Sequence, residues 1–255
     1  MARGLNRATI IGFVEREPEK RYTAAGQAVV SFAVLTYRQW TTLGGDDRES
    51  KEWFHVVAWG ALAEAASERL HQGQRVYVEG PLQTRSWQDN GGQRHCRTEV
   101  VATTLVPLDG RDEAGSCLPE DRELELPLCL NRVLVIGNLG RAPEMRYTPS
   151  GQAVASFSLA TTRSWNNTAG ERRDATEWFN AVAWGGLAEI CRQYLTRGRR
   201  VFVEGELRTR GWEQPGGARH YRTELVVSEM IVLGPRSPGN GADSALKIET
   251  EELPF

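Results

Sequence analysis

The feature that most constrains this chain of 255 residues is a long internal repeat. An offset of 125 positions pairs Asn6 with Asn131 near the start of the repeat and Glu99 with Glu224 near its end. The alignment needs no gap, and about half of the paired positions hold identical residues. Because solenoid repeats are much shorter, the pattern predicts two copies of one globular domain, at residues 1–108 and 128–233.

Each copy is predicted to contain five strands, with one helix between the third and the fourth. In the first copy we expect strands at about residues 6–14, 28–40, 52–60, 75–87 and 94–106. Between the third and fourth strands, apolar residues recur at helical spacing from Leu62 to Leu70, and Gly73 is placed to stop this helix. Long strands with internal glycines in this order are typical of a small Greek-key barrel of the OB type. The predicted fold class is therefore all-β, with one helix in each of two tandem OB-fold barrels.

Residues 109–127 are predicted to be an acidic linker, because carboxylates there accompany the strand-breaking residues Gly110, Gly115 and Pro119. Residues 234–255 hold too little apolar surface to form a core, so we expect a disordered acidic tail. The net charge of −2 conceals a contrast, since residues 1–108 carry +1 and residues 126–233 carry +4. The negative charge lies in the linker and the tail, which leaves the two domains suited to an anionic partner.

The sequence offers no arrangement typical of an enzyme active site. The four Cys lack CxxC spacing and have no His at zinc-ligand spacing, and His95 and His220 have no carboxylate pattern suited to a metal or a triad. We therefore expect no cofactor, no metal site and no enzymatic activity. No apolar run is long enough to span a bilayer and the start lacks a secretory signal pattern, so we expect no membrane association and a cytoplasmic location.

The central strand EWFHVVAWG of the first copy, residues 52–60, recurs as EWFNAVAWG at residues 177–185. Side chains alternate along a strand, so Trp53, His55, Val57 and Trp59 are expected on one face, opposite Phe54 and its even-numbered neighbours. The Trp-bearing face could fill a barrel interior, or it could form a stacking surface for a ligand. All eight Trp fall into matched pairs: Trp40 with Trp165, Trp53 with Trp178, Trp59 with Trp184, and Trp87 with Trp212. Four Trp per copy exceed what a barrel of this size easily hides, which favours stacking.

The fourth strand adds cations beside these rings. Gln83, Arg85 and Trp87 share one face by the period of two, and the second copy places Arg208, Arg210 and Trp212 at the same positions. Aromatic rings offer flat surfaces to bases, and guanidinium groups offer charge to phosphates. This combination predicts binding of single-stranded nucleic acid without reading of its sequence.

On these features the chain resembles the bacterial single-stranded DNA-binding protein family, in the two-OB-domain form of the Thermus and Deinococcus type. The most specific matches are NRATIIGFVEREPEKRYTAAGQAVVSF, EWFHVVAWG, LAEAASERLHQGQRVYVEGPLQTRSW and the end EELPF. The resemblance implies base stacking on the eight Trp and protection of single-stranded DNA in replication, recombination and repair. It also implies a nucleoid-associated homodimer, because family members place four OB folds in one assembly.

The resemblance assigns a role to the end of the chain as well. Family members end in an acidic cluster followed by a short apolar group that recruits replication, recombination and repair proteins. The residues at these positions are Glu249, Glu251, Glu252, Leu253, Pro254 and Phe255. A partner with a basic pocket and an apolar hole would accept this tip.

Two other functions remain open from the residues. A replication-restart adaptor also binds single-stranded DNA through an OB fold, but it would be expected to have one domain and no acidic tail. An OB-type protein-interaction module would bury its Trp as core and would not respond to poly(dT). If the chain does bind DNA, the second copy is expected to make more phosphate contacts, because Arg172 stands where the first copy has Asp47.

Overall fold

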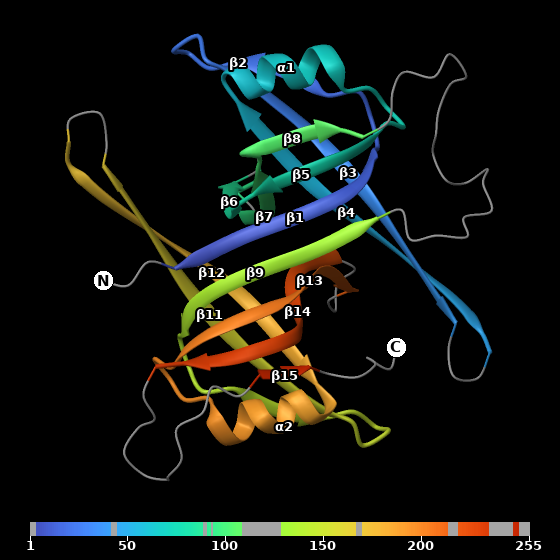
Figure 1. Ribbon diagram of the computed structural model, residues 1–255, viewed down its shortest axis with the longest axis vertical. Coiled ribbons are helices and arrows are strands. Elements are labelled where there is room, and N and C mark those ends of the chain that lie inside the picture. The colour runs from blue at the N-terminus through green and yellow to red at the C-terminus, as the bar shows by residue number, and fades with distance from the viewer. Residues whose placement is uncertain are drawn as a thin grey trace. The chain divides into compact units, whose positions relative to one another are not determined.

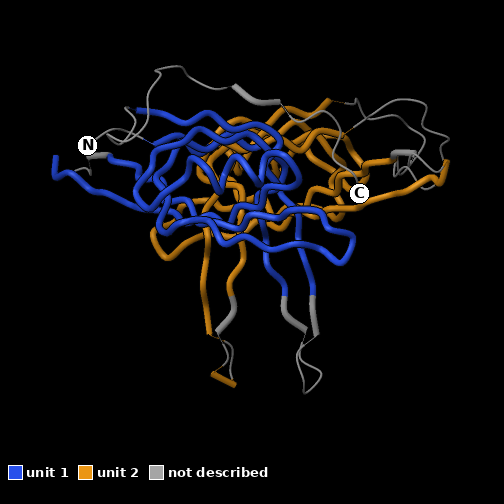
Figure 2. Tube along the Cα trace, turned by 90° about the horizontal axis from the view of Figure 1, so that it is seen from below, with its two compact units in different colours: residues 1–6, 133–255 blue, residues 7–132 orange. Residues whose placement is uncertain are grey.

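The computed structural model describes residues 4–41, 45–88, 91–92, 94–108, 129–166, 170–213, 219–234 and 247–249. The chain divides into two compact units, shown in different colours in Figure 2. Residues 7–132 form the unit that we call the N-terminal barrel, and residues 1–6 with 133–255 form the C-terminal barrel. The segment expected to be the acidic linker, residues 109–127, lies entirely outside the described residues.

The described residues of the first copy form eight strands and one helix (Figure 1). Their bounds are β1 Leu5–Val14, β2 Glu19–Tyr22, β3 Ala28–Thr41, β4 Asp47–Trp59, α1 Ala61–Arg69, β5 Arg75–Gly80, β6 Leu82–Gln88, β7 Arg94–Val101 and β8 Thr104–Pro107. In Figure 1, α1 lies beside β2 at one end of the barrel, and the β3–β4 hairpin extends away from that end.

Strand pairing closes these elements into a barrel. β1 pairs antiparallel with both β3 and β5, and β3 pairs with β4 along a long hairpin. β4 pairs parallel with β7, which pairs antiparallel with β6, while β8 pairs with β5. The parallel β4–β7 pair requires a crossover, and α1 lies in that connection. This circuit confirms the predicted all-β OB-type barrel with one helix.

The second copy repeats the circuit. Its elements are β9 Leu130–Leu139, β10 Glu144–Tyr147, β11 Ala153–Asn166, β12 Arg172–Trp184, α2 Gly185–Tyr194, β13 Arg200–Glu213 and β14 Arg219–Leu233, and β15 Lys247–Glu249 follows in the tail. β9 pairs with β11 and β13, β11 with β12, β13 with β14, and β12 runs parallel to β14. In Figure 1, α2 lies at one end of this barrel and the β11–β12 hairpin extends from the other.

The fourth predicted strand is broken in the first copy and continuous in the second. Pro81 separates β5 from β6, whereas Glu206 stands at the same position within β13. Proline has no N–H to donate to a strand ladder, so pairing is interrupted there. Gly80 and Gly205 precede these residues, and a Cβ added to either would lie 2.0 Å from a carbonyl oxygen of the facing strand. The close crossing of two strands explains why both copies have glycine at this position.

The alternation of side chains along the strands builds the core. Phe54, Val56 and Ala58 are buried as predicted, and so are their counterparts in β12. The helix closes one end of the barrel with Ala63 and Ala66. Val57 was expected on the outer face of β4, but it is only 6% exposed. The outer face of β4 is therefore interrupted between His55 and Trp59.

Three local expectations differ from the structure. α1 ends at Arg69 with Leu70 extended, and Gly73 occupies a later turn with φ of 79°, so Gly73 does not stop the helix. The third strand, expected at residues 52–60, begins earlier, since β4 runs from Asp47 to Trp59. Within the tail expected to be disordered, Lys247–Glu249 form β15 against β14. A strand edge with unpaired backbone groups accepts such an addition.

Candidate nucleic-acid interface

The Trp of the central strands lie at the surface rather than in the core. Trp53 and Trp59 on β4 are 46% and 41% exposed, and Trp178 on β12 is 55% exposed. Trp184, at the end of β12, is partly buried. The opposite face of each strand carries the buried rings of Phe54 and Phe179. The central strands therefore present indole rings outward, which contradicts the interpretation of these Trp as barrel filling.

The remaining four Trp lie in four hairpins, two in each barrel: β3–β4 and β6–β7 in the first copy, and β11–β12 and β13–β14 in the second. Trp87 on β6 is 44% exposed. For Trp40, Trp165 and Trp212 the structure describes the backbone, which pairs with Arg48, Arg173 and His220 respectively. Their side-chain positions lie outside what the structure describes. Each of these Trp lies near the loop end of a hairpin strand.

The β6–β7 hairpin combines an indole ring with two guanidinium groups. Arg85 is exposed and pairs across the strands with Arg97, next to the cross-strand pair of Trp87 with His95. The Arg97 guanidinium lies 5.6 Å from the centroid of the Trp87 ring, within the range of a cation–π contact. Its Nε and Nη2 donate to Glu99 Oε1 at 3.0 and 2.5 Å. Arg97 and Glu99 were not among the sequence-predicted site residues.

The β13–β14 hairpin carries the corresponding cations. Arg208, partly buried, donates to Glu206 at 2.6 Å, while exposed Arg210 lies 3.9 Å from Glu224. Arg222, matched to Arg97, has its Nε 3.7 Å from Glu224 Oε1. In both copies a largely buried carboxylate therefore lies beside the cations of this hairpin: Glu99 beside Arg97, and Glu224 beside Arg210 and Arg222. The recurrence of this Arg and Glu at the repeat offset was the signal that could have revealed them.

His55 lies between the two exposed Trp of β4 and is partly buried. Burial, and next the charge of Arg97, lower its pKa from the usual value, against smaller opposing effects of Glu99 and Glu15. The imidazole is therefore neutral at neutral pH and gives phosphate no full charge. Lys51, on the same strand, lies 5.0 Å from the centroid of the Tyr37 ring and 3.2 Å from Glu49.

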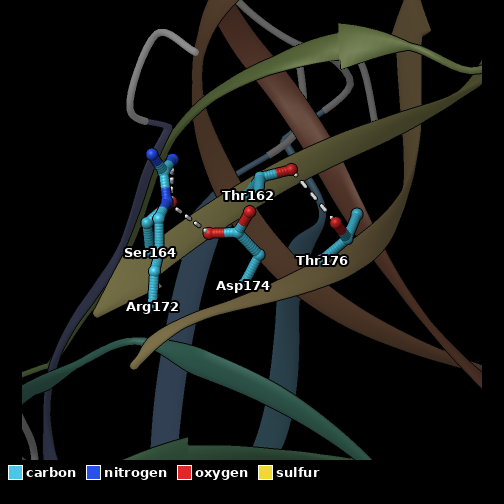
Figure 3. A network of polar contacts seen from close by, with 5 residues as sticks. All are labelled: Thr162, Ser164, Arg172, Asp174 and Thr176. Carbon is cyan, nitrogen blue, oxygen red and sulfur yellow. Dashed lines mark hydrogen bonds and ion pairs between the residues drawn. The ribbon is translucent and has the colours of Figure 1, made fainter. Parts of the chain in front are cut away.

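The β11–β12 hairpin holds a polar network, shown in Figure 3. Arg172 donates from Nε to Asp174 at 3.4 Å and from Nη2 to Ser164 at 3.2 Å, and the Thr162 and Thr176 hydroxyls lie 3.0 Å apart. Contacts with Ser164 and Arg172 lower the pKa of Asp174. Arg172 is thus paired with a carboxylate, although it remains largely exposed and close to solvent.

The two copies hold their matched central Trp in different ways. Trp53 Nε1 donates to Glu15 Oε1 at 3.0 Å. The position of Glu15 is taken in the second copy by Gly140, and a Cβ there would lie 2.5 Å from Cζ3 of Trp178. The Trp178 ring therefore packs directly over a glycine, in space that a side chain would fill.

Within the part of the chain that the structure describes, no cluster of three or more His, Cys, Asp or Glu could hold a metal ion. Cys191 is buried against Met230, with 3.9 Å between the sulfur atoms, and burial raises the pKa of its thiol to about 12. None of the described helices is long and apolar enough to cross a bilayer. The described residues thus present an aromatic and cationic surface.

Comparison with known proteins supports these assignments. Residues 5–108 and 130–233 each match the Single-strand binding protein family. The chain is 35% identical to the single-stranded DNA-binding protein of Thermus thermophilus, with all of both chains covered. It is 34% identical to the protein of the same name from Deinococcus radiodurans, covering 100% of this chain and 83% of that one.

A solved structure agrees with these matches. The crystal structure of the wild-type single-stranded DNA binding protein from Thermus aquaticus superimposes with a TM-score of 0.68 at 28% identity. The superposition covers 95% of this chain and 98% of that one. The matched family consists of binding proteins rather than enzymes, in agreement with the expected lack of enzymatic activity. Its two matches, the full-length relatives and the fold together show that the chain belongs to the Single-strand binding protein family.

Proposed function

We propose that this protein binds single-stranded DNA without reading its sequence and protects it during replication, recombination and repair. The observation that carries the proposal is the exposure of indole rings in both barrels, at Trp53, Trp59 and Trp87 and at Trp178, together with the Arg97 guanidinium over the Trp87 ring. Stacked bases need an accessible ring, and phosphates need a nearby cation. The residues proposed to contact DNA are Trp40, Trp53, Trp59, Arg85, Trp87, Trp165, Trp178, Trp184, Arg208, Arg210 and Trp212.

A titration with poly(dT) tests the proposal. We expect strong quenching of intrinsic fluorescence, because bases would stack on several of the eight Trp. At about 4–16 nucleotides per OB fold, four folds should cover a few tens of nucleotides. Double-stranded DNA of the same length is the control, since its base faces are already stacked. Fluorescence that stays constant with saturating poly(dT) at low salt would contradict the proposed function.

The assembly is proposed to be a homodimer with four OB folds, located in the cytoplasm with the nucleoid. Its support is the relation to family members that have two folds per chain. Sedimentation equilibrium should give a mass about twice 28.4 kDa. A mass of one chain, unchanged over a wide range of protein concentration, would contradict the dimer.

The C-terminal tip is proposed to recruit replication, recombination and repair proteins. Glu249 is the last residue of β15. The other proposed contact residues lie outside the described residues: Glu251, Glu252, Leu253, Pro254 and Phe255. Carboxylates repel phosphates, so deletion of residues 250–255 should leave DNA affinity equal or slightly higher at low salt. The same deletion should abolish capture of replication and repair proteins from a lysate. Much weaker DNA binding by the truncated chain would contradict this separation of roles.

A further inference from the structure

The backbone around the central Trp is the same in both copies. The N–H of Glu15 donates to the carbonyl oxygen of Ala33 at 2.9 Å, and the N–H of Gly140 donates to Ser158 at 3.0 Å. Ala33 is in register with His55 in the β3–β4 pair, and Ser158 is in register with Asn180 in the β11–β12 pair. Position 15 or 140 therefore lies beside the outward face of the central strand in each barrel.

The side chains at this position differ in a way that matters for a polyanion. The Glu15 carboxylate accepts a hydrogen bond from Trp53 Nε1 at 3.0 Å, so a negative charge lies at the edge of an indole ring that is 46% exposed. Its field also reaches His55, whose proton affinity it increases. Gly140 places no charge beside Trp178, and the matched residue in the central strand is the neutral Asn180.

We propose that Glu15 sets the affinity of the N-terminal barrel for single-stranded DNA, by holding the Trp53 indole and repelling phosphates from that stacking surface. The C-terminal barrel has Gly140 at this position and lacks the repulsive charge. It therefore binds the strand at a lower DNA concentration than the N-terminal barrel does. This inference rests on the proposed function and adds to it an order of engagement of the two barrels. The carboxylate lowers affinity without covering the ring, since Trp53 keeps nearly half of its surface exposed.

The electrostatic part of this effect has a defined dependence on salt. At an ionic strength of about 0.01 M charges interact over about 30 Å, and at about 0.15 M over about 8 Å. The repulsion between the Glu15 carboxylate and a bound strand should therefore be larger at low salt. Removing the charge should strengthen binding at low salt by about two- to fivefold, and by less at the higher salt.

Two substitutions in the full chain test the proposal. Glu15→Gln keeps an oxygen that can accept the Trp53 hydrogen bond but removes the charge, and Glu15→Gly recreates the residue of the second copy. Indole N–H signals in ¹⁵N–¹H spectra report each Trp separately, with Trp53 and Trp178 assigned from the signals missing in Trp53→Phe and Trp178→Phe. The probe is a dT oligomer of about 16 nucleotides.

In the unsubstituted protein, the Trp178 signal should respond at a lower oligomer concentration than the Trp53 signal. In both Glu15 variants, the Trp53 response should move to lower concentration at low salt. Glu68→Gln is the matched control, because Glu68 is an exposed residue of α1 and the second copy has Gln193 at that position. This control should leave the order of the two responses unchanged.

The experiment distinguishes a failure of this inference from a failure of the proposed function. Trp53 responses that stay unchanged or weaken in both Glu15 variants, while poly(dT) still quenches the protein, would overturn this inference alone. Weakening would mean that the carboxylate positions the ring for stacking. A protein whose indole signals do not respond to the oligomer at all would overturn the proposed function together with this inference.

Discussion

The Arg97 guanidinium lies over the Trp87 ring, 5.6 Å from its centroid, and the same group is bonded to the buried carboxylate of Glu99. A cation that contacts both a carboxylate and a ring restricts the rotamers of the ring, because movement of Trp87 would break a favourable contact. Figure 1 shows β6 and β7, which carry these side chains, as neighbouring elements of one hairpin. The exposed Trp of this hairpin is therefore held in place before any ligand arrives.

Arg97→Met should lower the free energy of unfolding by about 1–3 kcal/mol, because Glu99, only 5% exposed, would lose its counter-charge. The double variant Arg97→Met/Glu99→Met should recover part of this loss. Urea unfolding of the full chain measures both. Arg21→Met is the control, since Arg21 and Glu19 are an exposed pair expected to contribute less than about 1 kcal/mol. Equal destabilisation by the two single substitutions would contradict the argument.

Trp53→Ala and Trp178→Ala should each weaken binding of poly(dT) by about 1–3 kcal/mol, the contribution of one stacked base. Both rings are about half exposed, so their loss should leave the thermal transition of the protein nearly unchanged. Phe54→Ala provides the contrast, because this buried ring of the same strand should cost about 3–5 kcal/mol of stability. If Trp53→Ala abolished the cooperative transition, the ring would belong to the core.

The period of two along the strands allowed the sequence to predict which side of β4 is core and which carries Trp. The prediction succeeded for Trp53 and Phe54 because alternation is a local property of an extended chain. Alternation did not reveal that Val57, on the Trp-bearing side, is covered: it is only 6% exposed, and its carbonyl accepts from Ala102, next to the parallel β4–β7 pair. Tertiary neighbours of this kind are not encoded in the spacing of one strand.

Arg97 and Glu99 were missed for a related reason. Their relation to Trp87 depends on the register of β6 against β7, and the turn between these strands does not fix the register from sequence alone. The hydrogen bond from Trp53 to Glu15 could not be predicted from the sequence either, because it joins residues 38 positions apart. Comparison of the two copies could have singled out position 15, because Glu15 of the first copy is replaced by Gly140 in the second, although the sequences of the central strands are nearly the same.

The pH dependence of stability should carry a contribution from His55. Burial and the charge of Arg97 lower its pKa below the usual 6.5, so the unfolded chain binds a proton at a higher pH than the folded chain does. The free energy of unfolding should therefore fall as the pH drops through about 6.5, and this contribution should level off below the folded-state pKa. His55→Asn, which introduces the residue of the second copy, should reduce the loss measured by urea unfolding between about pH 7 and pH 5. An identical pH profile for the variant would rule out this role of His55.

Glycines of the two copies provide a final test of the fold. Gly80→Ala should be strongly destabilising, since its Cβ would lie 2.0 Å from the carbonyl oxygen of Val101, and backbone on both sides cannot move apart without breaking the barrel. Gly186→Ala is the matched control: apart from its chain neighbours and the backbone of its own helix, no atom lies within 4 Å of the added Cβ, and the first copy has Ala61 at this position. Because alanine favours a helix over glycine, this change in α2 should stabilise the protein by up to about 1 kcal/mol. Thermal unfolding compares the two, and a Gly80→Ala protein as stable as Gly186→Ala would mean that β5 and β7 do not cross as closely as the structure describes.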